Sequence, residues 1–308
     1  MIAASNLMAE AQSSTRLAAE MQISPARRFA WLVRRELWEN RSIYVAPLAV
    51  GAVALVGFLI ATVQWPAKIR AASSMDPMKL HAVIEQPFVI VALILMLVDI
   101  VVAAIYSLDA LYGERRDRSV LFWKSLPVSD FTTVLSKASI PILVLPVVCS
   151  VVTVVTQFLM LLVGSAVLAG NGMSASLLWT HVPFLQTAGI NFYHLVVFHG
   201  LWYAPFFGWL LLVSAWARRT PLLWAVLPPL AVAIVEKIAF NTSYFAGFLL
   251  HRFAGSPTSA GTAAMGMDML VPHHPGQFLV SAGLWLGLGL TAACLAAAAR
   301  LRRSRGVV

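Results

Sequence analysis

The chain has 308 residues, of which 60% are hydrophobic and only 11% are charged, and its mean hydropathy is +0.81. A soluble domain contains roughly 45–50% apolar and about 25% charged residues, so this composition excludes an ordinary soluble globular protein. The formal net charge of +9 is spread over the segments between apolar runs, where it acts as an orientation signal and requires no nucleic-acid partner.

The N-terminal part divides into two segments. Residues 1–24 are polar and lack the apolar core of a signal peptide, so we expect a mobile cytoplasmic tail. Residues 25–42 predict an amphipathic interfacial helix, whose apolar side carries Phe29, Leu32, Val33 and Leu37. The other side would lie at the membrane surface through Trp31, Arg34, Arg35 and Trp38. This pattern fits both an orientation anchor and an element that transmits movement.

Long apolar runs then predict transmembrane helices. A helix needs about 20 apolar residues to cross a hydrocarbon layer of about 30 Å, and it must satisfy its backbone hydrogen bonds internally. A β-barrel is excluded because runs such as 144–170 do not alternate apolar and polar residues. We therefore expect an all-α membrane protein with six spans, at about 43–64, 87–108, 138–168, 190–217, 221–240 and 278–299.

Basic residues are concentrated in alternate connections. They crowd the segments before span one, between spans two and three, between spans four and five, and after span six. The other connections carry only Lys68, Arg70, Lys79 and Arg252. Because basic loops stay in the cytoplasm, we expect both termini to be cytoplasmic, in a multi-pass protein of the bacterial inner membrane. The transmembrane domain would cover residues 43–305.

The cytoplasmic connection at 109–137 differs from an ordinary solvated loop. It combines charges with bulky apolar residues such as Phe122 and Trp123, the mixture expected of a protein interface. Pro127 should end a short transverse helix. Ser129 or Asp130 then caps the start of the helix that forms span three. That long helix should bend or project below the membrane, since it contains Pro141 and Pro146.

This connection resembles the coupling helix of type 2 ABC transporter permeases, which docks on the ATPase subunit. The similarity lies in the order Glu114-Arg115, Arg118-Ser119-Val120-Leu121, Ser125-Leu126-Pro127-Val128-Ser129 and Lys137. It extends to the layout of nearly the whole chain: an amphipathic entry helix, six spans, a cytoplasmic coupling helix and re-entrant helices before the last span.

The resemblance implies the permease subunit of an ATP-driven exporter, which dimerises with itself or a related permease and works with two copies of a separate ABC ATPase. It implies that ATP-driven closure of the ATPases pushes on a coupling interface formed by Glu114, Arg115, Arg116, Arg118, Ser119, Leu121, Phe122, Trp123, Lys124 and Pro127. No GxxxxGK[ST] motif occurs in the sequence. ATP and Mg would therefore bind the partner, and we expect this chain to bind no cofactor and to be no enzyme. Two other functions stay open: an ion-gradient-driven secondary carrier and, less favoured, a membrane-embedded enzyme.

Three charged residues fall inside predicted spans: Asp99 in the second, and Glu236 and Lys237 in the fifth. An ionisable group at bilayer depth costs at least about 2.5–3.5 kcal/mol, so each should face the bundle interior or water. In the family, the second and fifth spans line the transport pathway, which makes these residues candidate pathway-lining groups. The alternative is structural, with Glu236 and Lys237 pairing near the outer interface.

The remaining motifs predict packing rather than chemistry. His194 and His199 are five residues apart, about 140° around an α-helix, so they should not share a face, and we expect no metal site. Gly283 and Gly287 form a GxxxG pattern that favours close helix contact, more within the chain than across a dimer. On the outer side, the uncharged segment 174–189 should rest on the membrane surface, and 241–277 should contain re-entrant helices that dip into the outer leaflet.

Overall fold

The computed structural model describes residues 24–74, 76–117, 129–254 and 275–304. These residues form helices without any strand. Five helices are long and apolar enough to cross a membrane, and the bent pair Phe184–Trp202 with Ala204–Trp216 makes a sixth crossing if it is counted as one span. The predictions of an all-helical fold and of helices able to cross a membrane are therefore confirmed for the described residues.

Parts of three predicted segments lie outside the described residues. They are 1–23 of the N-terminal tail, 118–128 in the middle of the coupling loop, and 255–274 in the middle of the outer segment.

The described helices follow one another in the order α2 (Pro25–Glu39), α3 (Ser42–Ala61), α4 (Trp65–Ser73), α5 (Pro77–Asp109), α6 (Tyr112–Arg116), α8 (Asp130–Ser139), η1 (Ile140–Val144), α9 (Leu145–Gly170), α10 (Ser176–His181), α11 (Phe184–Phe192), η2 (Tyr193–His199), α12 (Gly200–Trp202), α13 (Ala204–Trp216), α14 (Pro221–Phe240), α15 (Tyr244–Ala254), α16 (Pro275–Val280) and α17 (Ala282–Ser304). The two segments named η are π-helical turns.

The long helices overlap the six predicted spans, but several boundaries differ. The second span begins at Pro77 rather than near 87, because the Asp76 side chain accepts a hydrogen bond from the backbone N–H of Met78 and caps the helix there. The bent pair that overlaps the fourth predicted span begins at Phe184, so 184–189 form the start of its first helix, although they were expected in the segment resting on the outer surface. That span bends by 50° before Ala204.

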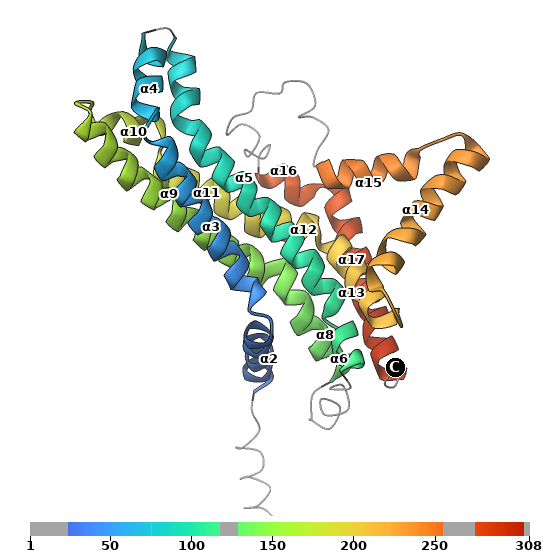
Figure 1. Cartoon of the computed structure of the whole chain (residues 1–308). Helices are drawn as coiled ribbons and strands as arrows, with labels where there is room; N and C mark the ends of the chain where they lie inside the picture. The colour runs from blue at the N-terminus through green and yellow to red at the C-terminus, as the bar shows by residue number, and fades with distance from the viewer. Residues whose placement is uncertain (1–23, 75, 118–128, 255–274, 305–308) are drawn as a thin grey trace, which may run out of the picture.

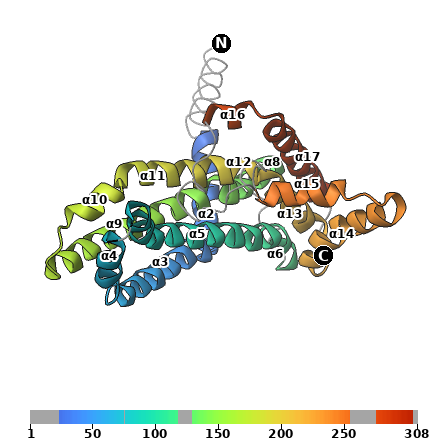
Figure 2. The ribbon, with the colours of Figure 1, turned by 90° about the horizontal axis from the view of Figure 1, so that it is seen from above.

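The helices gather into a bundle whose lower end in Figure 1 we call the basal end. α3, α5 and α9 lie side by side, α13 packs against α17, and α14 is outermost (Figure 1 and Figure 2). At the basal end, α2, α6, the start of α8 and the end of α17 come together, so both described chain ends lie there (Figure 1). α4, α10, α15 and α16 lie at the opposite, upper end.

Two large apolar clusters form most of the core, and a small third one joins Val213, Ala217 and Ala225. One joins α5, α9, η2, α13 and α17 through residues such as Met96, Leu145 and Phe207. The other joins α3, α4, α5, α9 and α10 nearer the upper end, around Phe88 and Leu161. In α14, by contrast, only Ala225 is buried. The apolar side chains of α14 are therefore available to lipid or to another protein.

Two π-helical turns face each other inside the bundle. η1 contains Pro141, which has no N–H to donate and so disturbs the α-helical ladder. The Ile142 carbonyl also lacks its usual helical donor four residues on, because residue 146 is proline. Gly200, directly after η2, packs its α-carbon against this carbonyl, and a Cβ atom there would overlap the oxygen. The expected irregularity of span three is thus a π-helical turn, and the same feature in span four was not foreseen.

The amphipathic character of α2 is confirmed. Val33 and Leu37 pack against the apolar core, while Trp31 and Trp38 are exposed. The Arg34 guanidinium lies 5.7 Å and 4.8 Å from the centres of these two indole rings. Such a surface suits a membrane interface, where indole rings and guanidinium groups lie at headgroup level.

Candidate functional site

A short helix at the basal end carries the first site. α6 is held against the end of α13, because the backbone N–H groups of Leu111 and Tyr112 both donate to the Ser214 hydroxyl, at 3.0 and 2.9 Å. The Arg115 guanidinium adds hydrogen bonds to the carbonyls of Ser214 and Ala217, at 2.7 and 2.6 Å. These bonds fix the direction in which Glu114 points.

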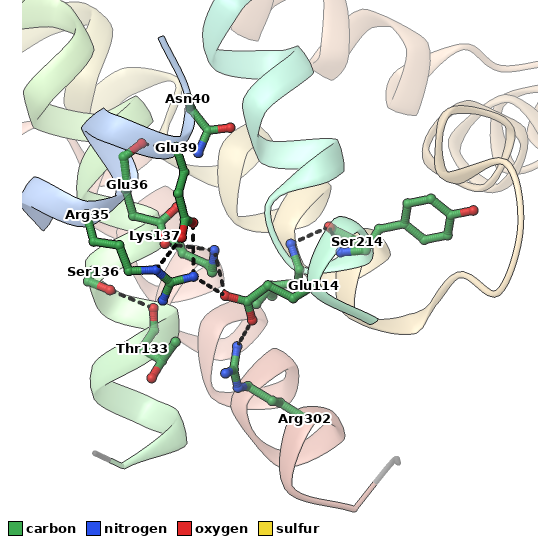
Figure 3. A network of polar contacts seen from close by, with 12 residues as sticks. Arg35, Glu36, Glu39, Asn40, Glu114, Thr133, Ser136, Lys137, Ser214 and Arg302 are labelled. Atoms are coloured by element: carbon green, nitrogen blue, oxygen red, sulfur yellow. Dashed lines mark hydrogen bonds and ion pairs between the residues drawn. The ribbon is translucent and has the colours of Figure 1, made fainter. Parts of the chain in front are cut away.

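Glu114 lies at the centre of a set of buried ion pairs (Figure 3). One carboxylate oxygen lies 2.6 Å from Arg302 Nη1, and the other lies 3.1 Å from Lys137 Nζ and 3.3 Å from Arg35 Nη2. Only 7% of the Glu114 side chain is exposed. A carboxylate at this depth stays charged because three cations and their N–H groups surround it.

Two further anions, Glu36 and Asp130, complete the charge balance. Glu36 accepts from Lys137 Nζ at 2.9 Å and from the Tyr106 hydroxyl at 2.7 Å, and Asp130 accepts from Arg302 Nε at 3.1 Å. We call this set the basal ion cluster: the cations Arg35, Lys137 and Arg302 with the anions Glu36, Glu114 and Asp130. Formal charges within it cancel, which is the arrangement that buried ions require.

The basal ion cluster ties together helices that are distant in sequence. Arg35 and Glu36 belong to α2, Glu114 to α6, Lys137 to α8 and Arg302 to α17. At Arg35, burial would lower the pKa of the guanidinium, but the surrounding carboxylates, led by Glu39, outweigh burial and raise the pKa. α6 and α8 directly flank the segment 118–128, so the cluster connects both sides of the predicted coupling helix to α2 and α17.

This geometry changes the predicted coupling interface. Glu114 and Arg115 were expected in the interface with the ATPase, but both are buried and bind groups of the same chain. Arg35, expected at the membrane surface, points inward to the cluster instead. Arg116 does lie at the surface, with 57% of its side chain exposed and an ion pair to Asp117 at 3.0 Å.

The other predicted coupling residues lie outside the described part of the chain: Arg118, Ser119, Leu121, Phe122, Trp123, Lys124 and Pro127. Directly after them, the Ser129 hydroxyl accepts from the Thr132 N–H at 3.1 Å. One of the two caps expected for this helix is therefore confirmed.

The second site lies in the apolar part of α5. Asp99 is 1% exposed, and its Oδ2 lies 3.9 Å from Nδ1 of the His199 imidazole in η2. Asp99 Oδ1 and His199 Nδ1 have no hydrogen-bond partner among the described residues. The Cys149 thiol of α9 also contacts the Asp99 carboxylate. Asp99 therefore faces the bundle interior, as expected, but its partner was not identified from the sequence.

The π-helical turn corrects the predicted placement of the histidines. In an α-helix His194 and His199 would point about 140° apart, whereas η2 has more residues per turn and brings their ring centres to 5.2 Å. The Tyr203 ring meets His199 edge-on at 5.1 Å. Within the described ranges, no group of three or more His, Cys, Asp or Glu could hold a metal ion.

Polar side chains continue from this pair toward the upper end. Along α9, Cys149 is followed by Thr153 and Gln157, all buried. Gln157 Nε2 donates to the Phe88 carbonyl at 3.0 Å, and Asn191 Nδ2 donates to Gln157 Oε1 at 2.9 Å. The four-residue spacing of the polar residues on α9 was visible in the sequence, and it is the signal that could have revealed this buried face.

Glu236 and Lys237 do not join Asp99. They lie on the outermost helix, and the Glu236 carboxylate accepts from the backbone N–H groups of Tyr244 and Phe245, at 2.6 and 2.8 Å, and from the Thr242 hydroxyl at 2.8 Å. Glu236 therefore holds the start of α15, which favours the structural alternative over a pathway role. Lys237 is exposed.

The GxxxG pattern accommodates an arginine. Arg252 of α15 is buried, donates to the Gly283 carbonyl at 2.9 Å, and lies 4.0 Å from the ring centre of Trp202. A Cβ atom on Gly287 would overlap its guanidinium. Burial lowers the pKa of Arg252 below its ordinary value, and the nearby Tyr203 opposes that shift. The glycines thus pack within the chain, as predicted, and attach α15 to α17.

No protein-family model, curated protein or solved structure matches the chain. The evidence on its function is therefore the geometry of the two sites and the sequence of the predicted coupling loop, 109–137.

Proposed function

We propose that the chain is the transmembrane permease subunit of an ATP-driven ABC exporter in the bacterial inner membrane, with both termini in the cytoplasm. Two copies, or this chain with a related permease, would form the substrate pathway together with two copies of a separate ATPase. The observation that carries the proposal is the basal ion cluster. It joins α2, α6, α8 and α17 on both sides of the segment whose sequence resembles a coupling helix.

The cluster suits a mechanical role. A push on segment 118–128 would reach α6 and α8, which flank it directly. Glu114 passes the displacement to α17 through Arg302 and to α2 through Arg35, because buried ion pairs at these distances resist separation. The first, second, third and sixth spans would then move together rather than singly.

The energy for this movement would come from the partner. ATP shifts a conformational equilibrium only if it binds one state better than the other, and here it would favour the closed state of the ATPase dimer. ATP and Mg would bind that partner, and this chain would provide the surface on which the ATPase docks. Arg116, whose side chain is exposed beside segment 118–128, is available for an ionic contact with the ATPase.

Phe122→Ala combined with Trp123→Ala tests the coupling. We expect the variant to fold and reach the membrane normally, while the co-expressed ATPase loses its dependence on the permease. A matched control is Phe248→Ala with Trp285→Ala, which removes exposed aromatic rings elsewhere. Cross-linkers at Arg118 or Trp123 should also capture an ATP-hydrolysing protein. Normal coupling in the first variant, with no such capture, would contradict the proposal.

A second candidate, a secondary carrier driven by protons, is favoured by the buried Asp99 and His199 pair. The two functions differ in their energy source. Transport by whole cells should stop on ATP depletion if the exporter proposal holds, and on collapse of the proton gradient at constant ATP if the carrier proposal holds. Asp99→Asn would abolish gradient-driven transport outright, because a carrier needs a group that binds and releases the coupling proton.

A further inference from the structure

The contact between Asp99 and His199 joins two spans through ionisable groups in an apolar setting. The carboxylate comes from α5 and the imidazole from η2, and their side chains are 1% and 8% exposed. The distance of 3.9 Å between Oδ2 and Nδ1 is close enough for strong electrostatic coupling but too long for a direct hydrogen bond. Each residue also keeps one polar atom without a partner among the described residues.

The charge state of this pair depends on a single proton. With one proton, the pair is neutral overall, either as carboxylate with imidazolium or as carboxylic acid with neutral imidazole. Loss of that proton leaves a net negative charge in the bundle, and a second proton leaves a net positive one. Either uncompensated charge is costly at this depth.

Among the described residues, no further ion faces the pair to compensate its charge. The titratable groups that face the pair are the Cys149 thiol of α9, the His194 imidazole of η2 and the Tyr203 phenol. None of these three is a permanent cation. η1, which packs against η2, consists only of the apolar residues of Ile140–Val144.

We propose that Asp99 and His199 together form a proton-binding site, and that occupancy by one proton holds α5 against the fourth span. A proton requires no cavity, which suits two side chains this deeply packed. The described part of the chain offers no cluster of metal ligands around the pair, so a proton fits the site better than a metal ion.

The local backbone conformation positions His199 in the site. The π-helical turn rotates His199 into the same region as His194, and the close contact of Gly200 with the Ile142 carbonyl holds the end of this turn against η1. Thr153, Gln157 and Asn191 continue the buried polar face toward the upper end. Hydroxyl and amide groups can pass hydrogen bonds along this face, so the proton would be exchanged with that side.

The test is an infrared titration of the purified full-length chain in lipid nanodiscs, without any ATPase. The carbonyl band of a protonated, buried carboxylic acid should appear and disappear with pH in the wild type. Asp99→Asn should remove this band. His199→Gln should move its midpoint to higher pH by about one unit or more, because the carboxylate loses its facing imidazolium.

Glu85→Gln is the matched control, because Glu85 is also a buried carboxylate of α5 near a histidine, with His81 Nε2 at 3.3 Å, but the side chain of this histidine is 51% exposed. It should leave the band of Asp99 unchanged. A titrating band that survives in Asp99→Asn, or a midpoint unaffected by His199→Gln, would overturn the proposal. Because the measurement uses the chain alone, its outcome is independent of whether an ATPase partner exists.

Discussion

Glu114→Gln tests the basal ion cluster most directly. The substitution keeps the shape of the side chain but removes the negative charge that faces Arg302, Lys137 and Arg35 at 2.6, 3.1 and 3.3 Å. Breaking a buried ion pair by neutralising one partner typically costs about 3–5 kcal/mol, because the remaining charge is left uncompensated.

The structure places the expected loss at the lower end of this range. Lys137 keeps Glu36 at 2.9 Å, and Arg302 keeps Asp130 at 3.1 Å, so neither cation is left alone. We therefore expect Glu114→Gln to lower the free energy of unfolding by about 3 kcal/mol. Because the pairs are buried, added salt should change this loss little.

Glu39→Gln is the control, because it also removes one negative charge that faces Arg35, but at the protein surface. Glu39 pairs with Arg35 at 2.7 Å, but 48% of its side chain is exposed, and such surface pairs contribute about 0–1 kcal/mol. The assay is equilibrium unfolding in mixed micelles, followed by tryptophan fluorescence. Equal losses for the two variants, or a loss below about 1 kcal/mol for Glu114→Gln, would refute a structural role for the cluster.

Three further predictions concern packing and the partner surface. Gly200→Ala should lower the free energy of unfolding by about 1–3 kcal/mol, because its new methyl group meets a backbone carbonyl. Gly57→Ala, in an open position of α3, should leave it unchanged, and equilibrium unfolding in micelles measures both variants. Gly287→Ala should displace the guanidinium packed against it and release α15, seen as faster proteolysis at the upper end, while Gly289→Ala, with open space around it, should not. Arg116→Glu should leave the unfolding midpoint unchanged, because its side chain is 57% exposed, but should weaken recovery of an ATPase in pull-downs; unchanged recovery would exclude Arg116 from the interface.

The sequence alone determined the class of fold. Apolar length predicted the positions of the spans, because crossing a membrane requires about 20 apolar residues whatever packs around them. Helical periodicity predicted the buried side of α2, where Val33 and Leu37 meet the core. The glycine pattern on α17 predicted a close contact within the chain. These features depend on residues near one another in sequence.

Only the tertiary structure decided how the charges are used. Glu114 and Arg302 are 188 positions apart, and nothing local in either segment specifies that they pair. A charged residue near an apolar run looks the same whether it faces solvent or a counter-ion, so Glu114 was expected at a surface. Its burial follows from four helices meeting at one end of the bundle.

The histidines show the same limit at shorter range. Their predicted separation assumed an α-helix, but the proline-disturbed turn of η1 and its contact with Gly200 accompany a π-helical turn that brings His194 and His199 together. Helix register depends on which backbone groups keep their partners, and that is set by the neighbouring spans. The positions of the spans could thus be derived from the chain, while the partner of each buried ionisable group was decided by packing.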